Sequence, residues 1–169
     1  MAMTGLDELF DYKNQMAKDI LTDKEIVKLI NSSVCEDEVT QLMYTQVFPF
    51  EYIPQTIDEG KTFVCMEVEI QKTEGRTFLY PIIYIWVFTH QSQMRLPEGG
   101  VRVDKLCSEI CEKINGSYKY GLGELSLSSV RRYNPSSDFR GKVMIFYAKD
   151  YNRLHSASNE LPSNRKRDN

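Results

Sequence analysis

The sequence lacks an apolar run long enough to cross a bilayer. Its most apolar stretch, FLYPIIYIWVFTHQ (Phe78–Gln91), is shorter than the about 20 residues that a membrane-spanning helix needs. The N-terminal residues also lack a basic segment followed by an apolar block, which is the pattern of a secretion signal. We therefore expect a protein that is synthesised in a cytoplasm and has no membrane partner.

An excess of basic residues is lacking as well. The net charge is −3, from 21 Lys and Arg against 24 Asp and Glu. Because nucleic-acid binders draw much of their affinity from a basic face, we expect no specific nucleic-acid recognition. The four cysteines are Cys35, Cys65, Cys107 and Cys111. A chain of 169 residues can bury a sufficient core without disulfides or a metal, so we expect free thiols in a reducing compartment.

Signatures of catalysis are scarce. Cys107 and Cys111 have a spacing that can hold a metal, but two further ligands are lacking, and we interpret both thiols as part of a buried helix face. His90 ends the long apolar run and is expected to be a hydrogen-bonded structural residue. Glu67 and Glu69 could serve acid–base chemistry, but their alternation with apolar residues favours a face that is solvated or meets a neighbour. We predict that the protein is not an enzyme and has no catalytic, cofactor-binding or metal-binding residues.

Three segments have the apolar periodicity of helices. The first, within 6–21, repeats apolar residues at intervals of three and four, namely Leu6, Leu9, Phe10, Met16, Ile20 and Leu21. A short second helix is predicted within 22–31, with Thr22 or Asp23 as its N-cap. The third, VRVDKLCSEICEKINGS (101–117), carries its apolar residues on one side and ends in Asn-Gly-Ser.

Four segments have the composition of β-strands. KTFVCMEVEIQK (61–72) alternates apolar and charged residues, which indicates a strand with one wet face. The run 78–91 is apolar on both faces and contains Pro81, so we expect a long strand that is covered on both sides and has an edge or a bulge at the proline. The segments 120–133 and 142–152 complete the set.

The predicted order of elements is α-α-β-β-α-β-β. Because helices and strands occur in separate blocks, this order predicts an α+β fold with an antiparallel (mixed) β-sheet and helices packed on one face. We assign residues 1–152 to a single domain and the polar residues 153–169 to a C-terminal tail. Within the domain, 34–60 is expected to be an extended loop or arm with a short helix near 39–44.

The apolar surface of the run 78–91 exceeds what one small domain needs. We expect one face of this strand to pack on the helix at 101–115 and the other to meet a neighbouring subunit or the segment 34–60. Extended aromatic segments can also add a strand to the sheet edge of a neighbour. The aromatic residues that we nominate for a contact between subunits are Phe48, Phe50, Tyr52, Tyr80, Tyr84 and Trp86.

Four parts of the chain resemble the neck and tail-completion proteins of tailed bacteriophages. They are AKDILTDKEIVKLIN, YPIIYIWVFTHQ, VDKLCSEICEKING and GLGELSLSSVRRYNPSSDFRGKVMIFYAKDYN, and the resemblance spans Ala17 to Arg153. In these proteins a long strand of aromatic and aliphatic residues is followed by a helix and then by a glycine-marked strand. The segment 34–60 and the charged C-terminal tail depart from that pattern.

The resemblance implies a function and a set of partners. The tail-terminator members of that group have an α+β fold, form a hexameric ring on the last ring of the tail tube, present a surface to the connector of the head, and have no catalytic residues. By this resemblance the chain is expected to be a virion structural protein of the neck and tail. Its partners would be itself as a closed ring, a hexamer, together with the tail tube protein and the neck or connector proteins, with no cofactor.

Other readings of the sequence stay open. A head-closure or adaptor protein of the neck needs the same kinds of contact as a tail terminator. A small nuclease would use Glu67, Glu69 and Asp58 to hold a divalent ion, although these acids lack the closely spaced lysine typical of such sites. A regulatory protein that binds one partner as a monomer is a third class.

Overall fold

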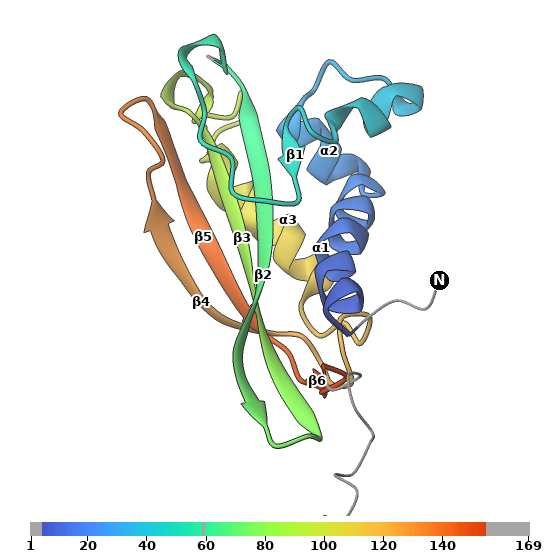
Figure 1. The fold of residues 1–169 in the computed structure, drawn as a ribbon. Coiled ribbons are helices and arrows are strands. Elements are labelled where there is room, and N and C mark those ends of the chain that lie inside the picture. The colour runs from blue at the N-terminus through green and yellow to red at the C-terminus, as the bar shows by residue number, and fades with distance from the viewer. Residues whose placement is uncertain (1–4, 59, 155–169) are drawn as a thin grey trace, which may run out of the picture.

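A long antiparallel hairpin, formed by β2 (Thr62–Glu74) and β3 (Phe78–His90), lies at the centre of the structure (Figure 1). The computed structural model describes residues 5–58 and 60–154. The helices in this part are α1 (Gly5–Leu21), α2 (Lys24–Ile30) and α3 (Arg102–Ile114), with short 3-10 helices η1 (Glu36–Leu42), η2 (Thr56–Asp58) and η3 (Gln91–Gln93). The other strands are β1 (Val47–Phe48), β4 (Ser126–Tyr133), β5 (Phe139–Tyr147) and β6 (Asp150–Tyr151). The predicted α+β class and the general order of elements are confirmed.

The sheet is mixed and has the strand order β1-β2-β3-β5-β4. β1 runs parallel to β2, whereas the other neighbouring strands are antiparallel. β6 pairs with the beginning of β3, and β5 pairs with the rest of it. β3 is therefore internal, and β4 forms one edge of the sheet because its only partner among the described strands is β5. The two-residue strand β1 was not predicted as a strand, and the single strand predicted over 142–152 is divided into β5 and β6.

Pro81 lies where the ladders on both sides of β3 are irregular. It pairs with Ile70 of β2, and β2 has a bulge between Ile70 and Lys72. On the other side of β3, pairing with β6 stops at Leu79 and pairing with β5 starts at Ile82. Because proline has no N–H to donate to a ladder, the irregularity falls where a hydrogen bond is missing anyway. The irregularity predicted at the proline is present, but the extra residue lies in β2 opposite Pro81 and not in the strand that carries the proline.

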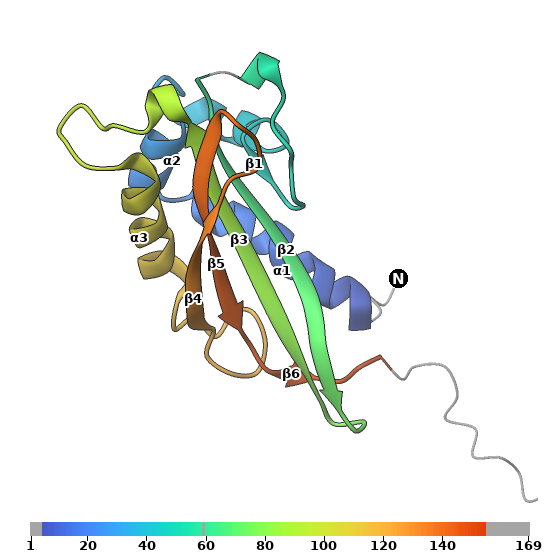
Figure 2. The ribbon, with the colours of Figure 1, turned by 90° about the vertical axis from the view of Figure 1, so that its left-hand side faces the viewer.

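All three α-helices pack on one face of the sheet, as predicted. α1 and α2 pack on β2, and α3 packs on β3 and β5. In Figure 2 the strands lie towards the viewer and α1 runs behind them. The layer between sheet and helices is a core of buried aliphatic side chains, among them Met66, Ile83, Ile85, Leu106 and Ile110, each of which is 0% exposed.

The buried stripe of α1 is narrower than the periodicity predicted. Leu9, Met16 and Ile20 are buried against the sheet, with at most 2% exposure. Leu6 and Phe10, which belonged to the predicted stripe, are 41% and 45% exposed. An apolar stripe shows which side of a helix faces the core, but the width that becomes covered depends on the elements packed against it.

The ends and faces of the other helices follow their sequence signals. Asp23, rather than Thr22, is the N-cap of α2, and its carboxylate accepts hydrogen bonds from the backbone N–H groups of Glu25 and Ile26. In α3, Cys107 is buried in the apolar face and Cys111 is partly buried at its margin. This confirms the interpretation of these two thiols as members of the apolar helix face.

Residues 34–58 have little regular structure. The short helix expected near 39–44 is the 3-10 helix η1, which lies slightly earlier in the chain. The predicted polar tail begins at 153, but Arg153 is still held to α1 by an ion pair with Glu8. The remainder of that tail, 155–169, lies outside the described residues.

Candidate interaction surface

One face of the sheet points away from the helices, and we call it the open face. Because side chains alternate along a strand, it carries every second residue of the central strand. In β3 these residues are Tyr80, Ile82, Tyr84, Trp86 and Phe88. None of the described α-helices packs on this face (Figure 2). The cover expected on both sides of the 78–91 strand is thus supplied by helices on one side only.

One end of the open face is covered by the chain's own arm, which we define as residues 47–58. The pairing of β1 with β2 brings Phe48 over the sheet, where its ring stacks on Tyr52 with centroids 4.3 Å apart. Tyr52 in turn lies 5.3 Å from Phe63. The buried members of this aromatic cluster are Phe48, Phe63, Cys65, Phe88 and Phe139. The expected cover by the segment 34–60 is thus confirmed for this end of the face.

Asp58 holds the arm in its folded shape. Its carboxylate accepts hydrogen bonds from the Tyr52 hydroxyl at 2.6 Å, the Gln55 backbone N–H at 2.9 Å and the Lys61 ammonium at 3.0 Å. Burial acts to raise the pKa of Asp58, but these hydrogen bonds together lower it below its ordinary value. The hydrogen bond that the Tyr52 hydroxyl donates to Asp58 raises the pKa of Tyr52 to about 12. The buried carboxylate is therefore charged and fully bonded.

The middle of the open face stays uncovered. Tyr84 and Trp86 stack with their ring centroids 5.6 Å apart, and both are partly exposed. Their neighbours on β5 are Ile145 and Val143, which are also partly exposed, and Tyr147 is 37% exposed. We call these five residues the exposed strip. A strip of adjoining aromatic and aliphatic side chains is the kind of surface that proteins use to bind one another.

The structure separates the six nominated aromatic residues by exposure. Phe48 is 6% exposed and packs inside the chain's own aromatic cluster together with Tyr52. Phe50 is 42% exposed on the arm and makes an edge contact with Phe48. Tyr84 and Trp86 belong to the exposed strip. A contact between subunits remains a prediction for all of them, and the exposed residues are the ones with free surface to make it.

Tyr80, the sixth, lies apart from the others near the tip of the β2–β3 hairpin. Its hydroxyl donates to the carboxylate of Glu74, and the Lys72 ammonium lies 4.6 Å from its ring centroid. The ammonium of Lys149 approaches the same ring at 5.9 Å. Tyr80 is thus surrounded by charged groups.

Tyr133 of β4 belongs to this surface but was not found by sequence reasoning. Its ring centroid lies 6.2 Å from that of Trp86, and its hydroxyl donates to the Glu51 carboxylate of the arm at 2.6 Å. Burial and this hydrogen bond raise the pKa of Tyr133. Tyr133 therefore joins the edge strand to the arm. No local pattern revealed this, because the strand neighbours of β3 are decided by the fold.

The three acids considered for a divalent ion are not brought together. The Glu67 carboxylate accepts hydrogen bonds from Lys13 at 2.5 Å and from the Val68 backbone N–H at 3.0 Å. Glu69 is exposed, and Asp58 is enclosed in the arm. Within residues 5–58 and 60–154 there is no group of three or more His, Cys, Asp or Glu that could hold a metal ion.

The buried thiols and His90 have structural surroundings. Burial raises the pKa values of Cys65 and Cys107 to about 12, so both stay protonated and unreactive at neutral pH. His90 accepts a hydrogen bond from the Ser92 backbone N–H at 3.3 Å and makes an edge contact with the ring of Phe139. Its predicted role as a hydrogen-bonded structural residue is confirmed.

Comparison with known proteins places the chain in a family. The YomW family model matches residues 12–148, which includes most of α1 and the sheet through β5. The chain belongs to the YomW family. The family name is phage-derived, so YomW membership associates the chain with a bacteriophage. A comparison with curated proteins gave no match. None of the helices in the described part of this YomW protein is long and apolar enough to span a membrane.

Proposed function

We propose that this protein is a non-enzymatic structural protein of the virion, a tail-terminator or tail-completion ring subunit at the head–tail junction. In this role copies of the chain form a closed ring, a hexamer, that caps the tail tube and joins it to the neck and connector. The phage-derived family supports the association with a virus. The observation that carries the proposal is the uncovered strip of Tyr84, Trp86 and their β5 neighbours.

A partner accounts for this strip better than solvent does. The chain covers the aromatic cluster at one end of the open face with its own arm, but leaves stacked aromatic rings uncovered in the middle. Contiguous apolar surface on a soluble protein marks a contact with another molecule. A stable contact buries about 1,200 Å² or more in total, which one strip reaches only together with its surroundings. A ring subunit supplies such surface twice, once for each neighbour.

The arrangement of acids supports stoichiometric binding over catalysis. A nuclease of the kind considered above needs Glu67, Glu69 and Asp58 around one ion, and Asp58 is instead bonded to Tyr52 and Lys61. The double variant Glu67→Gln/Glu69→Gln separates the two functions. We expect it to assemble as the wild type does, whereas loss of a divalent-ion-dependent cleavage of DNA would favour the nuclease.

Electron microscopy of the phage particle tests the proposal directly. We expect density for a closed ring of this chain between the last ring of the tail tube and the connector. Particles made without the protein should have tails of uncontrolled length that do not join heads. A ring found higher in the neck would favour a head-closure or adaptor protein. Absence of the chain from the particle, or a single copy without sister contacts, would refute the proposal.

A further inference from the structure

The helix side of the molecule is hollowed beside β4. The hollow is a groove of about 470 Å³ between the start of α3, the end of β4 and the beginning of β5. Val101 and Val130, which line it, are 42% and 46% exposed. Val130 pairs with the buried Met144 and so faces the helix layer. It is uncovered because α3 packs on β3 and β5, one strand short of the edge.

Basic side chains surround these two valines. Arg131, Arg132, Arg140 and Lys142 all line the groove. Asp104 of α3 is its one acidic lining residue, and it is paired with Lys142 at 2.7 Å. Among the described residues, neither Arg132 nor Arg140 takes part in an ion pair, and Arg132 is exposed. Arg131 pairs with Val143, so its side chain points to the open face instead. The groove therefore presents free positive charge next to apolar surface.

The backbone of β4 borders the same groove. All eight residues of this strand lack a second strand partner in the described structure, since β5 occupies only one of its sides. Charged residues on an edge strand help to prevent unwanted pairing. That purpose alone requires neither a hollow nor two exposed valines. The combination of free backbone, valines and arginines is a docking surface that lacks an occupant in the isolated chain.

A surface with complementary charge lies on η1. This 3-10 helix begins with Glu36, Asp37 and Glu38, all of them exposed. Glu36 pairs with Lys24, and both side chains remain more than three-quarters exposed, at 78% and 79%. A second groove of about 350 Å³ separates η1 from α2 beside these acids. Its apolar lining residues are Leu21, Val27, Val34 and Val39.

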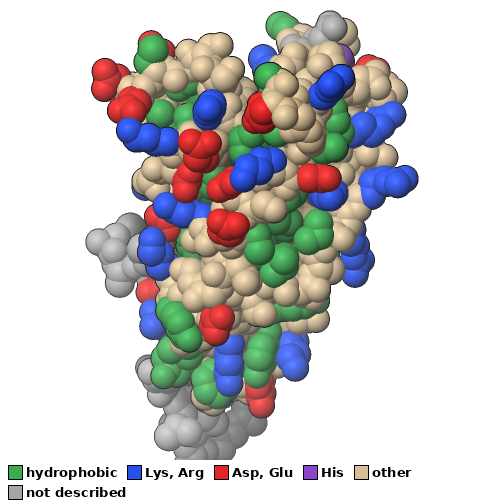
Figure 3. All heavy atoms as spheres, turned by 180° about the vertical axis from the view of Figure 1, so that it is seen from behind, with side chains coloured by type: hydrophobic (Ala, Val, Ile, Leu, Met, Phe, Trp, Pro, Cys, Tyr) green, Lys and Arg blue, Asp and Glu red, His purple; other side chains and the backbone are tan. Residues whose placement is uncertain are grey.

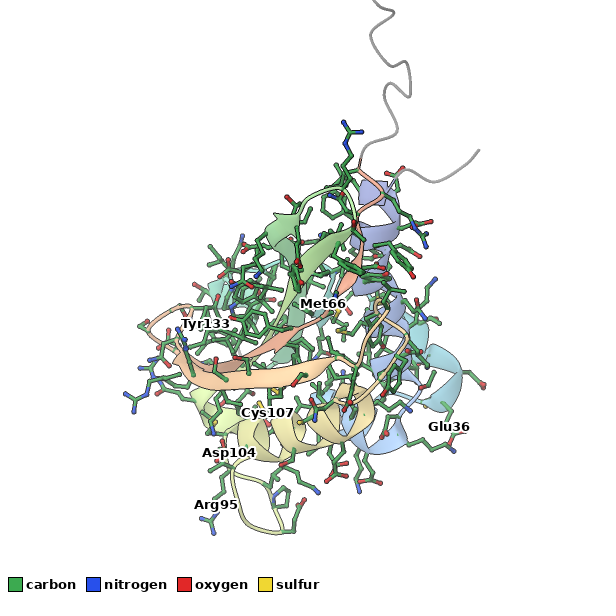
Figure 4. The ribbon with its side chains drawn as sticks, turned by 90° about the horizontal axis from the view of Figure 1, so that it is seen from below. Glu36, Met66, Arg95, Asp104, Cys107 and Tyr133 are labelled. Atoms are coloured by element: carbon green, nitrogen blue, oxygen red, sulfur yellow. The ribbon has the colours of Figure 1, made fainter. Side chains whose placement is uncertain are left out.

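The two surfaces lie on opposite sides of the molecule. Figure 4 shows Tyr133, at the end of β4, on one side and Glu36 on the other, with Met66 in the core between them. In Figure 3, which shows the molecule from the α3 side, Lys and Arg side chains follow the right-hand margin and Asp and Glu side chains occupy the upper left corner. An acidic and a basic surface on opposite sides of one chain cannot contact each other, but those of two neighbouring copies can.

We propose that neighbouring copies bind head to tail, with the acidic start of η1 from one copy seated in the basic groove beside β4 of the next. Arg132 and Arg140 then pair with Asp37 and Glu38, and Val130 packs against apolar side chains beside η1. Such a heterologous contact repeats in one direction and closes into a ring when the rotation between copies allows it. This inference rests on the proposed ring and adds a second contact between its subunits to the one proposed for the exposed strip.

A second copy fits the groove better than nucleic acid does. The valines give a nucleic-acid backbone nothing to bind, whereas η1 offers carboxylates and an apolar groove together. The overall charge of −3 also disfavours a polyanion.

Charge reversal in the full chain tests the contact. Sedimentation velocity over a range of concentrations, at about 0.05 M salt where charges are least screened, measures self-association. We expect Arg132→Glu/Arg140→Glu and, separately, Asp37→Arg/Glu38→Arg to weaken it by at least about tenfold. The chain that carries all four substitutions should regain association, because both patches are then reversed. Lys18→Glu/Lys113→Glu, which alters exposed lysines elsewhere, is the control and should associate normally.

Each other outcome overturns the inference. Association that both reversals leave unchanged, a fourfold variant that does not recover, or a wild-type chain that is monomeric at every concentration would each do so. So would duplex DNA binding by the wild type that Arg132→Glu/Arg140→Glu abolishes while association persists. A ring in the phage particle whose contacts exclude β4 and η1 would contradict this inference but would agree with the proposed function.

Discussion

Neighbouring residues of β3 meet very different surroundings on the two faces of the sheet. Ile83 and Ile85 are 0% exposed beneath the helices, whereas Tyr84 and Trp86, which alternate with them, are partly exposed on the open face. One face is completed by α1, α2 and α3, and the other only at the end where the arm folds over it. The comparison indicates that the helix face makes the fold stable and the open face is available for partners.

A charge placed on the helix face is expected to destabilise the protein most, and far more than a charge on the open face. Ile85→Asp puts an unpaired carboxylate where a side chain is fully buried, which costs about 3–5 kcal/mol of stability, a large share of the total. We expect loss of the native fold by circular dichroism and a shifted or absent urea transition. Tyr84→Lys, on the adjacent residue, is the control and should change stability by less than about 1 kcal/mol. Unchanged stability of Ile85→Asp would show that the helix face is assigned wrongly.

The arm should behave as core at one residue and as surface two residues later. Phe48→Ala removes a ring that is 6% exposed, so we expect a loss of about 3–5 kcal/mol, towards the lower end because the arm can relax. Phe50→Ala removes a ring that is 42% exposed and should cost below about 1 kcal/mol. Urea unfolding of both variants measures the difference. Equal losses would mean that the arm does not cover the open face as described.

Gly141 tests how tightly β5 packs beside the aromatic cluster. A Cβ at this position would lie 2.1 Å from the Val87 carbonyl oxygen and 2.5 Å from the Phe88 Cβ. Gly141→Ala should therefore destabilise the protein by about 1–3 kcal/mol through overpacking. At Gly123 the nearest atom is 4.0 Å away, so Gly123→Ala is a matched control. Thermal unfolding that shows the same midpoint for both variants would contradict the close β3–β5 contact.

Acid should loosen the arm before it affects the helix face. The hydrogen bonds to Asp58 keep its pKa below the ordinary value, so its stabilisation is present above that value, about 3.9, and is lost as the pH falls through the lowered pKa. We expect Asp58→Asn to be less stable than the wild type by roughly 1 kcal/mol at neutral pH. The gap in the free energy of unfolding should narrow as the pH falls below the ordinary pKa of an aspartate, about 3.9. A gap that is independent of pH in urea unfolding would argue against a charged Asp58.

Much of the fold could be predicted from local patterns. The alternation of Met66 and Val68 with Glu67 identified β2, and the spacing of apolar residues identified α1, α2 and α3. The exposed members of the candidate surface, Tyr84 and Trp86, were also nominated from the sequence. Exposure itself was not predictable, since Phe48 and Phe50 have the same side chain and the same local context but different burial.

The parts that could not be predicted depend on contacts between distant segments. The strand order that places β5 next to β3 and leaves β4 at the edge has no local signal. Tyr133 reaches Glu51 across 82 positions of sequence, and the groove beside β4 exists only because α3 stops short of that strand. The fold alone shows that Arg132 faces the groove beside β4 while its neighbour Arg131 points to the open face.

By itself, the amino-acid sequence determined which segments are helices and strands and which side of each is apolar, because periods of 3.6 and 2.0 are set by the local backbone. Only the tertiary structure decided which apolar side is covered by helices, which by the arm and which by nothing. That decision depends on how far the helices and the arm extend across the sheet, which is a property of their packing together rather than of any one segment.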